Sequence, residues 1–222
     1  IQSSLAGDYT GCQTTPAHPK DALTRFHLVA VGGYLLKSSE QRQRIALLAS
    51  HLGRHQIEKL MERLNEGYMR ALGESDPDRQ AQIWSMHEAT EQQLAQQFQR
   101  FSDELSQADE AATRVNRNPL PHAHRWLPAF LAPGFDLREV MRVHARGIAQ
   151  TLDRATATPD PRKKARTLLA ELYLMQHSCH WYCRSRSVAS ARLLVRHQTT
   201  YEQLLDAVSP ATRDAYLKVV QG

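Results

Sequence analysis

The densest group of chemically active side chains lies at residues 177–183, where the sequence reads His-Ser-Cys-His-Trp-Tyr-Cys. On a helix, Cys179 and Cys183 are one turn apart on the same face, a spacing that gives a metal ion two ligands from one element. His87 and His144 are the candidates for the two further ligands of a tetrahedral site, because each interrupts the apolar stripe of another expected helix. The alternative is that both cysteines are small core residues, since free cysteine is among the most buried residue types. We expect this second arrangement, and therefore no metal and no cofactor.

Recognisable catalytic motifs are missing from the sequence. It has no glycine-rich phosphate loop, no H-E-x-x-H motif, no nucleophile elbow and no Cys-x-x-Cys pair. The pair His122 and His124 falls in a proline-rich stretch where a solvated loop is expected. We therefore predict a protein without enzymatic activity and without catalytic residues.

Basic residues are concentrated in the C-terminal half of the chain. Residues 1–110 contain fifteen acidic and eleven basic side chains, whereas residues 111–222 contain eight acidic and seventeen basic ones. Arg162–Arg166 crowd the start of an expected helix, where positive charge opposes the helix dipole, so helix stability does not explain them and an anionic partner does. The predicted nucleic-acid-binding residues are Arg162, Lys163, Lys164, Arg166, Arg184, Arg186, Arg192 and Arg196. A solvated basic face is the alternative.

A second argument for nucleic acid is local and concerns residues 49–60. Ala49 lies four residues before Gly53, and apolar residues follow from Ile57, which is similar to a helix-turn-helix. An ordinary hairpin of two helices is the alternative.

The hydrophobic period is helical from Asp21 onward. We expect a helix from Asp21 to Leu36, a second from a capping box at Ser38 to Leu52, and a third from Ile57 to Gly73. Asp76-Pro77 then predicts the start of a long helix. Its expected buried stripe includes Ile83, Leu94, Phe98, Phe101 and Leu105.

The second half repeats this pattern after a proline-rich connector at about residues 109–135. A helix is expected from Asp136 to Leu152, and a long one from Asp160-Pro161 that breaks near Ser185–Ser187. Val188–His197 and a short helix from Ser209-Pro210 are expected to follow. No alternating strand pattern competes with these helices.

These elements predict an all-α fold, a bundle of roughly six to eight helices. Residues 1–19 are expected to form a flexible arm, and residues 20–222 a single all-helical domain. One interpretation adds two related helical hairpins, because a shift of 80 residues places Gly67 on Gly147 and a shift of 84 places Asp76-Pro77 on Asp160-Pro161. Chance similarity between amphipathic helices is the other.

Composition limits the class of protein and its compartment. The 222 residues are 41% hydrophobic and have a mean hydropathy of -0.53, which excludes a membrane-embedded or wholly disordered chain. The longest apolar stretch, Leu28–Leu36, is far shorter than the roughly 20 residues of a membrane span. Three cysteines are too few for a disulfide scaffold, so we expect a reducing, cytoplasmic location. The alternative is the cell envelope, because small residues precede Cys12 as at a bacterial lipidation site.

We therefore predict a non-enzymatic helical protein that engages nucleic acid through its basic C-terminal half, as a regulator or as an accessory subunit of a larger assembly. The alternative is a protein–protein adaptor or cell-envelope scaffold, lipid-anchored through Cys12, whose basic half meets an acidic partner or the acidic half of another copy. Both interpretations expect a protein partner or self-association and no transmembrane segment.

Overall fold

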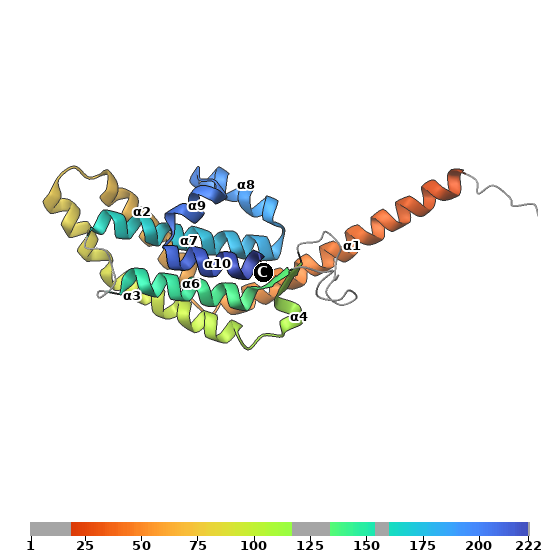
Figure 1. Ribbon diagram of the computed structural model, residues 1–222, viewed down its shortest axis with the longest axis horizontal. Coiled ribbons are helices and arrows are strands. Elements are labelled where there is room, and N and C mark those ends of the chain that lie inside the picture. The colour runs from red at the N-terminus through yellow and green to blue at the C-terminus, as the bar shows by residue number, and fades with distance from the viewer. Residues whose placement is uncertain (1–18, 117–133, 154–159, 222) are drawn as a thin grey trace, which may run out of the picture. The chain divides into compact units, whose positions relative to one another are not determined.

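The computed structural model describes residues 19–116, 134–153 and 160–221, with side chains described from residue 34 onward. By its internal contacts the chain divides into two units, residues 1–38 and 39–222. The described part of the first unit is helical and belongs to α1 (Pro19–Leu52). The arm predicted for residues 1–19 lies outside the described residues, apart from Pro19, which begins α1. The other elements drawn in Figure 1 belong to the second unit.

Helix α1 is continuous over 34 residues, whereas the sequence analysis expected two helices with a break before Ser38. A capping motif begins a helix only where the preceding residue leaves the helical conformation, and no proline between residues 20 and 52 forces this. A serine inside a helix costs only about half a kcal/mol relative to alanine. Ending one helix and nucleating another would cost more, so the two expected helices merge.

Helices α2 (Ile57–Gly73) and α3 (Pro77–Leu105) pack against each other (Figure 1). Both begin where the sequence predicts. The Asp76 carboxylate caps α3 by accepting hydrogen bonds from the backbone N–H groups of Asp78 and Arg79. The predicted stripe of α3 is fully buried at Leu94, Phe98, Phe101 and Leu105, and half-buried at Ile83.

The connector contains short regular elements that the sequence analysis did not expect. Helix α4 (Glu110–Thr113) leads into strand β1 (Arg114–Asn116), which pairs antiparallel with β2 (Gly134–Asp136). Three-residue strands are too short to give an alternating pattern, and each depends on a partner distant in sequence. The prolines and histidines at 119–133 lie outside the described residues.

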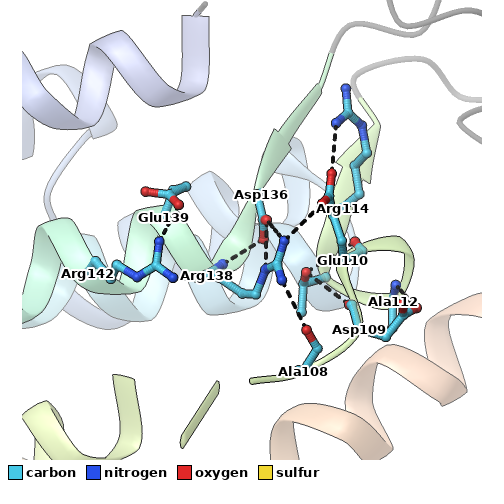
Figure 2. A network of polar contacts seen from close by, with 10 residues as sticks. Ala108, Asp109, Glu110, Ala112, Arg114, Asp136, Arg138, Glu139 and Arg142 are labelled. Atoms are coloured by element: carbon cyan, nitrogen blue, oxygen red, sulfur yellow. Dashed lines mark hydrogen bonds and ion pairs between the residues drawn. The ribbon is translucent and has the colours of Figure 1, made fainter. Parts of the chain in front are cut away.

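Arg138 joins the two ends of this connector (Figure 2). Its guanidinium donates to Asp136 Oδ2 at 2.8 Å and to the backbone oxygen of Ala108 at 3.1 Å, and it lies 3.4 Å from Glu110 Oε2. These contacts fix α4 and β1 against the start of the next helix, α6 (Leu137–Leu152).

Helix α6 packs against α3, α7 (Pro161–Cys183) and α10 (Pro210–Gln221) (Figure 1). The predicted break after α7 is confirmed, because α7 ends at Cys183 and α8 (Arg186–His197) begins after the cap Ser185. Helix α9 (Tyr201–Ala207) was not expected. It begins at a capping box formed by Thr200 and Gln203.

The helical fold class is confirmed. Nine helices and the two short strands make up the secondary structure of the described residues. None of these described helices combines the length and the apolar character needed to cross a membrane.

Candidate functional site

Helices α7 and α8 form an antiparallel hairpin, and two side-chain contacts set its register. Arg192 Nη1 of α8 lies 3.3 Å from His180 Nδ1 of α7. The second contact lies nearer the end of α8 and nearer the start of α7. There the ring of His197 of α8 stacks on that of Tyr173 of α7, with centroids 3.7 Å apart and planes inclined by 24°. Because α8 returns alongside α7, exposed residues of both helices line one seam.

The cations predicted to bind nucleic acid lie along this hairpin, and most have no ion-pair partner among the described residues. Among the described residues, seven of the eight have no carboxylate oxygen within 4.0 Å; Lys164 is the exception. Arg44, Arg138 and Arg213 elsewhere in the fold each have such a partner. The α7–α8 hairpin therefore carries excess positive charge at its surface.

The eight predicted cations differ in the contacts that their side chains make with other described residues. Lys163, Arg166 and Arg196 are exposed and make no hydrogen bond or ion pair with the described part of the chain. Arg162 donates to Gln80 at 3.3 Å and Arg184 to Gln41 at 2.9 Å, contacts that leave their charges unneutralised.

Arg186 is held against aromatic rings. Its guanidinium carbon lies 4.8 Å from the ring centroid of Tyr201 and 5.6 Å from that of Trp181. These cation–π contacts give Arg186 a structural role in joining α8 to α7 and α9.

Lys164 faces the interior. Its ammonium ion-pairs with Glu91 of α3, whose side chain is only 7% exposed, and the same carboxylate accepts a hydrogen bond from the hydroxyl of buried Tyr68. Burial and the neighbouring Glu91 charge raise the pKa of Tyr68. Helix stability does not explain the basic start of α7, and for Lys164 the explanation is the ion pair with Glu91.

Two cavities lie between α2, α7 and α8, and they differ in charge. One, of about 620 Å³, is lined by three acidic side chains of α2, Glu58, Glu62 and Glu66, and by the cations Lys59 and Arg196. The other, of about 520 Å³, is lined by Arg166 and Arg196 and by no carboxylate. Tyr173, His197 and Asn65 line both cavities. Sequence reasoning missed these three residues, because only the packing of separate helices brings them together.

Among the described residues, no further ligands are grouped with the cysteine pair proposed as half of a metal site. Within the described ranges no three His, Cys, Asp or Glu side chains are grouped so that they could hold a metal ion. Cys179 is buried with its Sγ 3.7 Å from Met175 Sδ, and burial raises the pKa of its thiol. His87 instead packs edge-on against Tyr68.

His144, the other proposed ligand, lies beside Ser178 in the core. Its Nε2 is 2.9 Å from Ser178 Oγ, and the serine hydroxyl donates to the backbone oxygen of Leu174. The serine therefore accepts from His144 Nε2–H, which defines a neutral tautomer. Burial, with a smaller effect of His177, lowers the pKa of His144 to about 3. Both side chains are fully buried, so a substrate cannot reach them.

The residues proposed as a helix-turn-helix do form two helices joined at 53–56. The exposed face of α2, which would serve as the recognition helix, carries Glu58, Lys59, Glu62 and Arg63. This mixed charge does not complement a phosphate backbone as well as the α7–α8 hairpin does.

Comparison of the chain with protein-family models, with curated proteins and with solved structures finds no match.

Proposed function

We propose that this protein binds nucleic acid through the exposed arginines along the α7–α8 hairpin. The observation that supports this most strongly is that Arg166, Arg192 and Arg196 lie along one seam and that no carboxylate oxygen of the described residues lies within 4.0 Å of them. Lys163, Arg162 and Arg184 extend the positive charge at either end. A row of such cations releases condensed counterions when it contacts phosphates, which drives binding.

Lys164 and Arg186 have no part in this proposal, because each is held by other side chains. A binding role rather than catalysis is favoured by the burial of the His144–Ser178 pair. We infer that the protein acts in the cytoplasm as a regulator or as an accessory subunit of a larger assembly.

The test is a fluorescence-anisotropy titration with labelled nucleic acid at two salt concentrations. Arg192→Glu/Arg196→Glu should weaken binding at least tenfold, and wild-type affinity should fall with salt with a log–log slope of about -0.7 to -0.9 per phosphate contacted. Arg79→Glu/Arg100→Glu, which makes the same charge change on α3, is the matched control. Absence of binding at low salt, or equal losses in both double variants, would contradict the proposal.

The second candidate function is a protein–protein adaptor. It is favoured by the apolar residues that α8 exposes beside its arginines, above all Val195 at 85% and Leu194 at 53%. An acidic partner with an apolar centre would complement this surface. Leu194→Ser/Val195→Ser should then abolish partner capture while leaving nucleic-acid affinity unchanged. Lipid anchoring through Cys12 belongs to this candidate, and Cys12 lies outside the described residues.

We also propose that α2–α3 and α6–α7 are two related hairpins. Gly67 of α2 packs against His87, ten residues after Pro77, and Gly147 of α6 packs against Glu171, ten residues after Pro161. The same small residue thus meets the same turn of the following helix in both pairs.

A further inference from the structure

The cavity of about 520 Å³ between α2, α7 and α8 differs from its neighbour in being cationic. Arg166 and Arg196 line it, no carboxylate does, and neither arginine has a hydrogen-bonding or ion-pairing partner among the described residues. The neighbouring cavity shares Arg196 and also has Lys59, but three glutamates line it as well, so its formal charge is negative. An anionic group is therefore attracted more strongly to the first cavity than to the second.

An aromatic pair stands where the two cavities meet. His197 stacks on Tyr173, and the hydroxyl of Tyr173 donates to Asn65 Oδ1 of α2, which fixes the phenol ring in position. Burial, with a smaller effect of Arg196, lowers the pKa of His197, which favours the neutral ring. A neutral ring held in this way offers a π surface on which a planar group can stack.

The remaining lining has both apolar and polar groups. Leu72, Leu169 and Leu204 give apolar surface, while Gln198 and Thr199 give hydrogen-bonding groups. The volume falls within the roughly 300–1,000 Å³ of small-molecule pockets. The ligand that these features fit together is a planar, polar-edged ring attached to a phosphate.

We propose that this cavity takes one unstacked nucleotide of a nucleic-acid strand, with the phosphate at Arg166 and Arg196 and the base against His197. This inference rests on the proposed function and narrows it, because it makes single-stranded nucleic acid the preferred ligand. Bases within a duplex are paired and stacked, whereas a single strand can turn a base out into a pocket.

The experiment compares a labelled single strand of about fifteen nucleotides with the same strand annealed to its complement, at low salt. The wild-type protein should bind the single strand roughly tenfold more tightly than the duplex. His197→Ala should remove most of this preference, and His197→Phe should keep it, because phenylalanine retains the stacking surface. Arg166→Glu should weaken single-strand binding more than Arg100→Glu, which makes the same charge change on α3. The circular dichroism spectrum of each variant should match that of the wild type, which would show that the variant is folded.

The outcomes separate this inference from the proposed function. Equal affinity for single strand and duplex, or an unchanged preference in His197→Ala, overturns the nucleotide pocket and leaves nucleic-acid binding by the hairpin in place. Absence of binding to either probe overturns both.

Discussion

The ammonium group of Lys164 ion-pairs with the carboxylate of Glu91, which fastens the start of α7 to the middle of α3 inside the fold. The partners are 73 residues apart in sequence, and Tyr68 of α2 donates to the same carboxylate. One buried charge thus connects three helices.

Lys164→Ala should lower the free energy of unfolding by about 3 kcal/mol, because it leaves the buried Glu91 carboxylate without its cation. Glu91→Leu/Lys164→Met replaces both charges by apolar groups and should recover most of the loss. Urea denaturation measures the free energy of unfolding of both variants. Lys163→Ala, an exposed neighbour, is the control and should change stability by less than about 0.5 kcal/mol. Similar losses at 163 and 164 would show that the ion pair contributes nothing specific.

Acid should destabilise the fold through His144 and His177. The pKa of His144 is lowered to about 3 and that of His177 to about 4, from an ordinary value of 6.5. Burial is the main cause in both cases. Because the folded-state values lie below the unfolded one, this contribution to stability is complete above about pH 6.5 and is lost as the pH falls toward the folded values. At pH 5 each of the two histidines should have lowered the free energy of unfolding by about 2 kcal/mol. Urea denaturation across this range measures the loss, and His177→Gln should show about half of it.

Glu171 should give stability the opposite dependence on pH, so that the fold loses stability as the pH rises. Burial raises its pKa above the ordinary 4.5, so its contribution to stability is present at low pH and is lost as the pH rises through the raised value. Glu171→Gln keeps an oxygen to accept the hydrogen bond from the backbone N–H of Ser209. The variant should therefore be more stable than the wild type at pH 8 in thermal denaturation. An advantage that persists unchanged at pH 4 would count against this explanation.

Gly147→Ala should destabilise by about 1–3 kcal/mol, because a Cβ there would lie 2.7 Å from Glu171 Oε2 and would overlap Thr212 Oγ1. Gly73→Ala is the matched helical control, since a Cβ at 73 meets nothing within 4 Å. Alanine is the better helix former, so this variant should be neutral or stabilised by up to about 1 kcal/mol. Thermal denaturation of the two variants compares them directly.

Features that act locally were predictable from the sequence. Asp76-Pro77 and Asp160-Pro161 both begin helices, because an aspartate cap and a proline depend only on the next few residues. Ser185 likewise caps α8 after a predicted break. The error at Ser38 also has a local origin, since a capping motif was present but nothing ended the preceding helix.

Features that depend on distant partners were not predictable. The sequence places Lys164 among exposed cations, and only the position of Glu91 turns it inward. Tyr173 and His197 give no pattern in one dimension, yet they meet where α8 returns along α7. The charge distribution therefore predicted cationic side chains of the α7–α8 hairpin, whereas the aromatic pair beside them required the structure.

The β1–β2 pair gives the fold an insertion point. Asn116 and Gly134 are partners in the antiparallel register, so the two positions that flank residues 117–133 are neighbours. A two-residue Asn-Gly turn in place of residues 117–133 would therefore join β1 to β2 in the observed register. A longer peptide could also join them, since each doubling of a closed loop costs only about 0.6 kcal/mol. Gly134 must be kept in either case, because a Cβ there would overlap the backbone oxygen of Val115.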